Sequence, residues 1–325
     1  MEHEDSQRKQ DMVKATAPGK VILFGEHAVV YGRPAIAVPL SEVRATAIIQ
    51  PGRREGVLLL APDLGLKRKL ANADADDAIA IAVRQVQDAI GLDQLPDMTI
   101  TVTSDIPIAS GLGSGASITA AIVRALASYL GKGYLATDEW VSRLTFEVEK
   151  VYHGTPSGID NTVVAYERPV YFVRQQPLNH IEAFEIARPL PLLIADTGVS
   201  SRTKAVVSDV RYAWQADSER FEYLFDSCGA IARIARDTIA NGDLIQTGQL
   251  MNENQALLVD MTVSSLELNR LVAVAIGAGA YGAKLSGAGR GGNMIALVDD
   301  ETELVVHTAL LEAGARSVLS SRISA

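Results

Sequence analysis

The chain has 325 residues, of which 48% are hydrophobic and 21% are charged, a balance that is typical of folded globular proteins and excludes disordered and fibrous classes. This length suits one large domain or two domains of medium size, and we expect two. The formal charge of -9 and the lack of a run of Lys and Arg argue against a nucleic-acid-binding surface. Backbone N–H groups can still hold an anionic ligand, whatever the net charge.

Cysteine usage and the N-terminal segment indicate the compartment. Cys228 is the only cysteine, so the chain forms neither an internal disulfide nor a thiolate metal cluster, which suits a reducing cytoplasm. Residues 1–12 are charged and lack the apolar core of a signal peptide, so we expect a disordered leader there. No apolar run approaches the roughly 20 residues that span a bilayer. The sequence predicts a cytoplasmic protein that binds neither nucleic acid nor membrane.

The first half of the chain predicts strands followed by helices. Alternating or β-branched residues bounded by Gly and Pro predict strands at residues 21–24, 43–49 and 98–104. Helical spacing of apolar residues then predicts helices at residues 76–90, from 114 to about 130, and from 137 to about 152, with Ser114 as the N-cap of the second. The predicted buried face of the third helix consists of Trp140, Leu144, Val148 and Val151. Glu149 falls off that face.

The second half predicts a mixture of strands and helices. Residues 169–173 and 192–195 read as short buried strands, separated by the polar, Pro-containing segment 174–191. We place the domain boundary in that segment, dividing the chain into residues 13–182 and 183–325. Helices are then predicted at 201–241, 243–260 and 264–278, and strands around residue 283 and at 294–298. Because strands and helices do not alternate strictly, the expected fold class is α+β.

Residues 108–117 (IASGLGSGAS) are the most informative segment. Its three glycines permit positive φ angles and close approach of a ligand to the backbone. The helix that begins there presents unpaired N–H groups and a partial positive charge. The segment therefore predicts a phosphate-binding loop, against the plainer alternative of a tight strand-to-helix turn.

Other nucleotide and catalytic motifs fit less well. The spacing Gly111-x-Gly113-x-x-Ala116 mimics a dinucleotide fingerprint, but the required acidic residue about 20 positions on is absent, since the first acidic residue after this loop is Asp138. A second GxGxxG at Gly287 leads into a predicted strand, and no Walker A sequence occurs. Neither GxSxG nor HExxH is present, which excludes the usual serine hydrolase and zinc peptidase motifs. Phosphate binding is therefore of a non-Walker type.

Three motifs together resemble the GHMP kinase superfamily of galactokinase, homoserine kinase, mevalonate kinase and phosphomevalonate kinase. They are residues 17–32 (APGKVILFGEHAVVYG), residues 108–117, and residues 282–297 (GAKLSGAGRGGNMIAL). The ending GEHAVVYG has the form found in the mevalonate-kinase family, and residues 149–160 and 196–204 also resemble segments of that family. Because five segments match in order, the resemblance covers nearly all of the chain after Val13.

The resemblance implies a fold and a reaction. The fold would have two domains, an N-terminal half like ribosomal protein S5 domain 2 and a ferredoxin-like C-terminal half, with the active site in the cleft between them. The reaction would be ATP-dependent phosphorylation of the 5-hydroxyl of (R)-mevalonate to 5-phosphomevalonate, a step of isoprenoid biosynthesis, with Mg²⁺ as cofactor. A homodimer is a further expectation from the family.

The resemblance also assigns catalytic roles. Asp160 would be the catalytic base, and Lys20 would lie beside it and stabilise the developing alkoxide. Glu149 would bind Mg²⁺, with Ser114 as a second ligand. Taken alone, these residues would read as an Asx-turn, a surface lysine and a solvated glutamate. The residues implied in binding the ATP phosphates are Ser110, Gly111, Leu112, Gly113, Ser114, Gly115, Ala116 and Ser117.

The acceptor site and a closing loop follow from the same resemblance. Acceptor binding would use Lys20, Glu26, His27, Asp160 and Thr203, and the loop that closes near the phosphates would be Gly287, Ala288 and Gly289. The sequence departs from the family pattern at Gly115, where many relatives have a second serine, and at Arg290, where many have glycine. Arg290 either contacts phosphate or points to solvent, and the second reading is favoured.

Three alternatives remain open from the sequence. The first is a sister kinase that acts on phosphomevalonate, on the 3-hydroxyl of mevalonate or on a sugar. The second is a non-catalytic ligand sensor on the same fold, against which the intact Lys20, Glu149 and Asp160 argue. The third, already weakened, is a nicotinamide-dependent enzyme.

Overall fold

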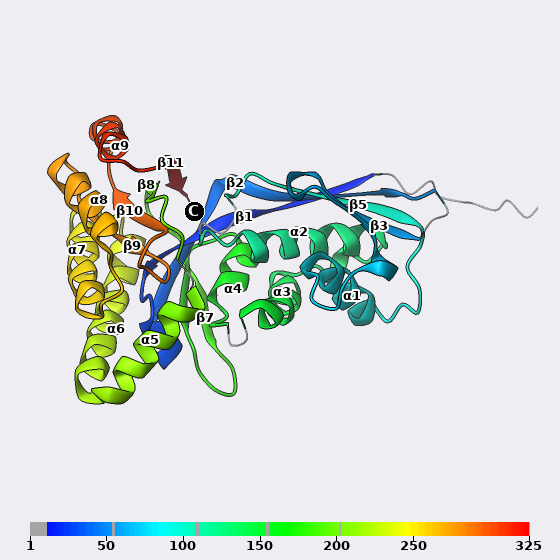
Figure 1. Ribbon diagram of the computed structural model, residues 1–325, viewed down its shortest axis with the longest axis horizontal. Helices are drawn as coiled ribbons and strands as arrows, with labels where there is room; N and C mark the ends of the chain where they lie inside the picture. The colour runs from blue at the N-terminus through cyan, green and yellow to red at the C-terminus, as the bar shows by residue number, and fades with distance from the viewer. Residues whose placement is uncertain (1–11, 54–55, 108–110, 154–155, 202, 325) are drawn as a thin grey trace, which may run out of the picture.

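The structure is a computed structural model that describes residues 12–53, 56–107, 111–153, 156–201 and 203–324. The molecule is elongated, and the first two strands run between two groups of helices (Figure 1). Residues 1–11 of the expected leader lie outside the described residues.

A seven-stranded sheet forms the N-terminal half, with the order β4-β3-β5-β2-β6-β7 and with β1 paired to the other edge of β2. Its strands are β1 (Val13–Phe24), β2 (Ala35–Pro51), β3 (Val57–Ala61), β4 (Leu66–Lys69), β5 (Met98–Ser104), β6 (Val170–Val173) and β7 (His180–Ala183). β3 and β5 run parallel, and the other neighbours are antiparallel. The pairing of β1 with β2 shifts register between Pro18 and Gly19, where residues 41–43 of β2 have no partner on β1, and again between Ile22 and Phe24.

Helices cover one face of this sheet (Figure 1). They are α1 (Ala78–Ile90), α2 (Ser114–Tyr129), α3 (Asp138–His153) and α4 (Ile159–Tyr166), and the short 3₁₀ helices of this half are η1 (Ala28–Tyr31), η2 (Pro62–Leu64), η3 (Leu70–Asn72) and η4 (Gly133–Leu135). α1 shows both expected end signals. The Asp77 carboxylate accepts hydrogen bonds from the N–H groups of Ile79 and Ala80, and Gly91 ends the helix in the left-handed conformation.

The C-terminal half contains a four-stranded antiparallel sheet of order β11-β8-β10-β9. Its strands are β8 (Leu190–Asp196), β9 (Gly282–Ser286), β10 (Asn293–Leu297) and β11 (Ser317–Ile323). Its helices are α5 (Thr203–Ala216), α6 (Ser218–Ala240), α7 (Leu244–Asp260), α8 (Leu266–Gly277) and α9 (Glu303–Glu312). The chain passes from the first sheet to the second between Ala183 and Leu190.

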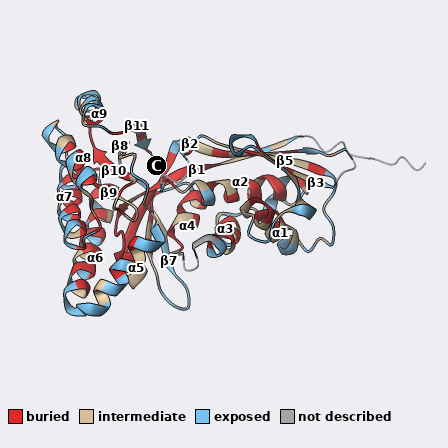
Figure 2. Cartoon of the chain, in the orientation of Figure 1, coloured by how far each residue is buried: buried red, intermediate tan, exposed pale blue. Residues whose placement is uncertain are grey.

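A shared hydrophobic core joins the halves. Val21 and Leu40 of the first sheet pack in one buried cluster with Leu192 and Ile295 of the second. Figure 2 shows buried residues along β1 and β2 and on the sides of the helices that face the strands. Burial of this apolar surface is the main favourable contribution to holding the halves together.

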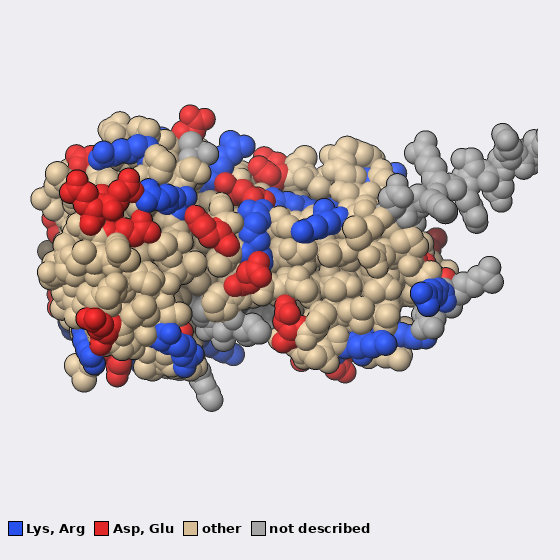
Figure 3. Space-filling view, turned by 90° about the horizontal axis from the view of Figure 1, so that it is seen from above, with Lys and Arg blue, Asp and Glu red and all other residues tan. Residues whose placement is uncertain are grey.

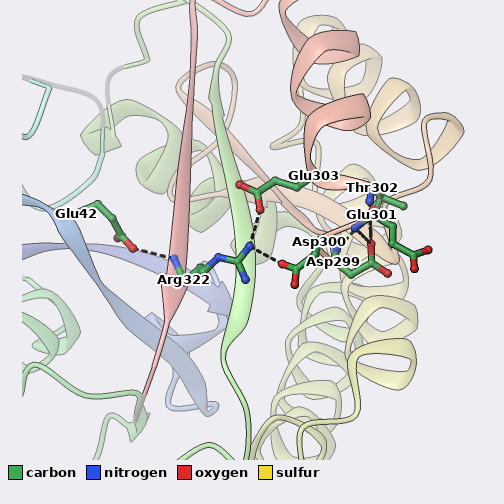
Figure 4. A network of polar contacts seen from close by, with 7 residues as sticks. All are labelled: Glu42, Asp299, Asp300, Glu301, Thr302, Glu303 and Arg322. Atoms are coloured by element: carbon green, nitrogen blue, oxygen red, sulfur yellow. Dashed lines mark hydrogen bonds and ion pairs between the residues drawn. The ribbon is translucent and has the colours of Figure 1, made fainter.

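A polar network adds to this junction at its exposed edge (Figure 4). The N–H of Arg322 on β11 donates to the Glu42 carboxylate on β2 at 2.9 Å. The Arg322 guanidinium pairs with Asp300 at 2.5 Å and Glu303 at 2.9 Å. Because half of the Arg322 side chain is exposed, these pairs contribute little to stability.

On the face in Figure 3, basic and acidic side chains lie interspersed across the middle of the molecule.

The α+β class is confirmed, and several details of the predicted elements are wrong. The N-cap of α2 is Gly113 and not Ser114. The helix predicted at 201–241 is two helices, since Asp217 caps α6 by accepting a hydrogen bond from Arg220 N. Val151, expected on the buried face of α3, is 50% exposed. None of the helices in the described part of the chain is long and apolar enough to cross a membrane.

Candidate active site

An ion pair between Lys20 and Asp160, both in the N-terminal half of the chain, lies at the centre of the site. Lys20 is on β1 directly after the register shift, and its Nζ lies 3.0 Å from Asp160 Oδ1. Lys20 is buried, whereas about a third of the Asp160 side chain is exposed. Asp160 is in the first turn of α4, where the helix dipole favours a carboxylate. The pair therefore places a partly accessible carboxylate next to a buried ammonium.

The glycine-rich loop passes over Lys20. Gly113 has φ +78°, and a Cβ at this position would lie 2.7 Å from Lys20 Cγ. The backbone N–H of Lys20 donates to Leu112 O at 2.9 Å. The first N–H groups of α2, from Ser114 to Ala116, have no acceptor within the helix. The start of α2 is thus fixed against β1, and its first N–H groups, which have no side-chain cap, lie at an end suited to an anion.

Of the residues predicted to bind phosphate, Ser117 does not fit as a direct ligand, and Ser110 cannot be placed. Ser117 is fully buried, its Oγ donates to Pro18 O at 2.6 Å, and its N–H donates to Gly113 O at 2.9 Å. The prediction that Ser117 contacts phosphate is therefore corrected: its hydrogen bonds hold the loop on β1. Ser110 lies outside the described residues.

Glu149 on α3 is buried, with 6% of its surface exposed, so its reading as a solvated side chain is wrong. It lies beside the start of α2, because a Cβ at Gly115 would be 3.4 Å from Glu149 Oε1. Burial, and then the negative charge of Asp160, raise the pKa of Glu149 from 4.5 to about 7, and the charge of Lys20 opposes this shift. The site therefore combines a buried carboxyl group with the free N–H groups of α2.

The GEHAVVYG segment bends sharply where β1 ends. Gly25 has φ +89°, and a Cβ there would lie 2.4 Å from Pro34 O, so only glycine fits this bend. Glu26 is buried and forms an ion pair with the fully buried Lys284 on β9. Burial raises the pKa of Glu26 and lowers the pKa of Lys284, and the attraction between the two charges opposes both shifts. This pair links the two halves of the chain.

His27 follows directly and is also buried. Its Nε2 lies 2.9 Å from Ala288 O, and because a carbonyl oxygen only accepts, we assign the proton to Nε2. Burial lowers the pKa of His27 from 6.5 to about 4, so the ring is neutral near pH 7. Its φ of 59° is unusual for a residue other than glycine. A neutral ring in this position has Nδ1 as an acceptor.

The third motif contacts the first at three alternate residues. Lys284 pairs with Glu26, Ser286 Oγ donates to Ile22 O at 2.9 Å, and Ala288 O accepts from His27. Lys284 and Ser286 lie two apart on β9, so their side chains point to the same face, whereas Ala288 in the following loop contacts His27 through its backbone carbonyl. Sequence reasoning missed Lys284. The signal that could have found it is a single charged residue in an otherwise apolar strand (GAKLS).

The loop between β9 and β10 includes the predicted closing glycines. A Cβ at Gly289 would lie 2.1 Å from Val263 O, so the loop requires glycine there, and Ser201 Oγ donates to Gly289 O at 2.6 Å. Gly287 has φ +92° and no neighbour within 4 Å of its Cβ position. The loop is held at Gly289 and open at Gly287.

Two further positions singled out in the sequence, Arg290 and Thr203, make no hydrogen bond or ion pair with Lys20 or Asp160 in the described part of the chain. The Arg290 guanidinium pairs with Asp209 on α5 and donates from Nε to Thr262 O at 3.2 Å, so the structure gives it protein partners. Thr203 is exposed at the start of α5. Within the described ranges, no hydrogen bond or ion pair joins Thr203 to Lys20, Asp160 or Glu26.

Family models match both halves of the chain. The model of the GHMP kinases N terminal domain matches residues 77–168, and the model described as GHMP kinases C terminal matches residues 235–315. A mevalonate kinase of Thermococcus onnurineus is 33% identical over 327 residues, which cover 95% of this chain and 95% of that protein. The chain belongs to the mevalonate kinase family of the GHMP kinases.

A further sequence and two crystal structures of mevalonate kinases are also similar to this chain. A mevalonate kinase of Aeropyrum pernix is 36% identical over 293 residues, 87% of this chain and 88% of that protein. The crystal structure of L. major mevalonate kinase in complex with R-mevalonate superposes with a TM-score of 0.82 and 32% identity, covering 96% of this chain and 95% of that chain. The Methanococcus jannaschii mevalonate kinase gives a TM-score of 0.83 at 25% identity, with 98% and 100% covered. The two-domain fold expected for the family is confirmed.

Proposed function

We propose that the chain is a mevalonate kinase, which transfers the γ-phosphoryl group of ATP to the 5-hydroxyl of (R)-mevalonate in isoprenoid biosynthesis. The observation that carries the proposal is the Lys20–Asp160 pair at 3.0 Å, in which Lys20 packs against Gly113 at the start of α2. The similarity to a relative solved in complex with R-mevalonate supports the choice of acceptor.

The proposed mechanism consists of one proton transfer and one phosphoryl transfer. Asp160 accepts the proton of the 5-hydroxyl, whose oxygen forms a bond to the γ-phosphorus as the bond to the leaving oxygen of ADP breaks. The Lys20 ammonium stabilises the charge that develops on the attacking oxygen. The N–H groups of the loop and of α2 hold the phosphates in line, which supplies much of the rate enhancement through positioning. Glu26 and His27 bind the acceptor.

The residues present fit Mg²⁺ as the cofactor. Glu149 supplies a hard carboxylate ligand beside the start of α2, and Ser114 supplies a hydroxyl in its first turn. The described residues contain no group of three or more His, Cys, Asp and Glu suited to a metal, which agrees with an ion that takes its other ligands from ATP and water. Bound Mg²⁺ would neutralise phosphate charge. This chain has Gly115 where many relatives have a second serine, so that serine hydroxyl is absent here.

Other expectations remain proposals. We propose the division into residues 13–182 and 183–325, a boundary that falls before the last residue of β7 in the first sheet and ahead of β8 in the second. A cytoplasmic location is supported by the use of a single cysteine, the buried Cys228. The proposed partners are ATP and mevalonate, and a homodimer is proposed from the family alone.

The first experiment measures ADP release with Mg-ATP and a panel of acceptors: mevalonate, phosphomevalonate, galactose, homoserine and none. Selective turnover of mevalonate, with NMR locating the phosphate on the 5-oxygen, is the expected result. Turnover of another acceptor would assign a sister activity. Silence with every acceptor, from folded protein that binds ATP, would overturn the proposal in favour of a ligand sensor.

A further inference from the structure

The Glu26–Lys284 pair is buried more deeply than stability alone explains. Lys284 is 0% exposed and Glu26 is 2% exposed. Removing two charges from water costs more than their attraction returns in many proteins, and apolar replacements are often at least as stable. A buried pair between residues 258 positions apart therefore calls for a role other than holding the fold.

Lys284 fixes one oxygen of Glu26. Its ammonium donates to Glu26 Oε1 and to Leu285 O, the latter at 2.7 Å. The backbone around it is also held, because Leu285 N donates to Gln255 Oε1 at 2.9 Å. With β9 fixed in this way, Lys284 sets the orientation of the Glu26 carboxylate.

The other oxygen of Glu26 lacks a partner. Glu26 Oε2 is buried and has no hydrogen-bond partner among the described residues. A buried carboxylate oxygen without a donor is costly, and such atoms in native proteins usually receive a hydrogen bond from another group. Glu26 lies two residues after the end of β1, the strand that carries Lys20, and Lys20 pairs with Asp160. The missing donor is therefore expected from a ligand next to the reacting groups.

The chemistry of the acceptor identifies that donor. Mevalonate has a carboxylate, a 5-hydroxyl and a tertiary 3-hydroxyl. Its carboxylate would be repelled by Glu26, and its 5-hydroxyl is used by Asp160 in the proposed mechanism. The 3-hydroxyl is the remaining donor.

We propose that Lys284 is a positioning residue for the acceptor: by holding Glu26 Oε1, it presents Glu26 Oε2 as a preformed acceptor for the 3-hydroxyl of mevalonate. This inference rests on the proposed function. It predicts that Lys284 acts on acceptor binding and leaves the nucleotide site unchanged, since the contacts described for the start of α2 are with Lys20 on β1.

The test compares steady-state kinetics and thermal unfolding of Lys284→Met and of the neutral double variant Glu26→Gln/Lys284→Met. Lys284→Met is expected to raise KM for mevalonate at least about tenfold, the size expected for a lost hydrogen bond to a charged group, with KM for ATP within about twofold. The double variant has no uncompensated charge, so its melting temperature is expected to return toward that of the wild type, while KM for mevalonate remains raised. Lys67→Met, an exposed lysine on β4, is the matched control and is expected to change neither quantity.

A second measurement uses 3-deoxymevalonate. The wild-type protein is expected to bind it at least about tenfold more weakly than mevalonate, and the double variant is expected to lose most of this discrimination. A double variant that recovers both the melting temperature and KM, or equal discrimination in both proteins, would overturn the inference and leave a structural pair. If Lys284→Met does not fold, the double variant carries the comparison. A wild-type protein without turnover would overturn the proposed function itself, and this is seen before any variant is made.

Discussion

Gly113 lies directly over the side chain of Lys20, so that a Cβ at residue 113 would be 2.7 Å from Lys20 Cγ. The residue that ends the phosphate loop and the lysine that contacts Asp160 are therefore in van der Waals contact. Any side chain at 113 must move Lys20 or lift the start of α2. This contact couples the position of the phosphates to the position of the base.

Gly113→Ala is expected to lower kcat by about 100-fold or more, because displacements of about 1 Å of a catalytic group have effects of this size. Gly91→Ala is the matched control. Gly91 has a similar φ of +74° at the end of α1 but no atom within 4 Å of its Cβ position, so it carries the backbone cost alone. Kinetics and thermal unfolding are measured on both. Equal kcat values for the two variants would show that glycine is required at 113 only for its left-handed backbone conformation and not for the contact with Lys20.

Asp160→Asn is expected to lower kcat by about 10²–10⁴-fold, the contribution of a general base. The amide keeps the size of the carboxylate and loses its ability to accept the proton. Binding of Mg-ATP, measured by nucleotide titration, is expected to stay within a few-fold of the wild type, since Asp160 is not among the proposed phosphate or metal ligands. Turnover at the wild-type rate would remove Asp160 from the mechanism.

Glu149 makes the metal-free protein less stable as the pH rises. Its pKa is raised from 4.5 to about 7 in the folded state, so between these values the folded protein holds a proton that the unfolded chain has released. The stability that this proton provides is full below pH 4.5 and is lost as the pH rises through 7. Relative to Glu149→Gln, the unfolding free energy of the wild type is expected to fall by about 3 kcal/mol across this window.

Urea unfolding of both proteins with EDTA and without nucleotide, at several values between pH 5 and 8, measures this difference. A difference that does not change with pH would mean that Glu149 titrates near its ordinary value. Adding Mg-ATP is expected to flatten the pH dependence of the wild type, because a bound metal favours the ionised carboxylate.

Arg290→Gly is expected to change kcat by less than about twofold. The guanidinium pairs with Asp209 and donates to Thr262 O, and these partners lie on α5 and after α7. The replacement loses a partly exposed ion pair worth at most about 1 kcal/mol. The backbone at residue 290 has a φ of 56°, which glycine adopts with less strain than arginine, so the melting temperature is expected to change little. A tenfold rise in KM for ATP would instead place Arg290 at the phosphates.

The sequence predicts the parts of the site that depend on local structure. The glycines before α2 indicated a capped anion site, and the structure has Gly113 as the N-cap with the first N–H groups free. Only the family resemblance brought Lys20 and Asp160 together, because no local pattern connects a strand residue with a helix 140 positions later. The pairing that the resemblance implied is present at 3.0 Å.

Burial on α3 could not be predicted from its own periodicity. Glu149 falls off the apolar stripe yet is 6% exposed, because the start of α2 lies against that side of the helix. Val151 is on the stripe yet is 50% exposed. Whether a helix face is buried depends on which other elements pack against it, and α2 begins 35 positions before Glu149 in the chain. The same reason explains why the buried Lys284 was missed.

The contacts between the first and third motifs also fix when the site can form during synthesis. Ser286 and Ile22 are 264 positions apart, and Lys284 and Glu26 are 258 apart. At a translation rate of about 5–20 residues per second, Glu26 leaves the ribosome roughly 10 to 50 s before its lysine partner. During this interval the nascent N-terminal half has an unpaired carboxylate and the uncovered face of β1 that will meet the second sheet. The acceptor site is therefore among the last parts of the molecule to be completed, and a chain that stops before β9 has the catalytic lysine and aspartate but not this site.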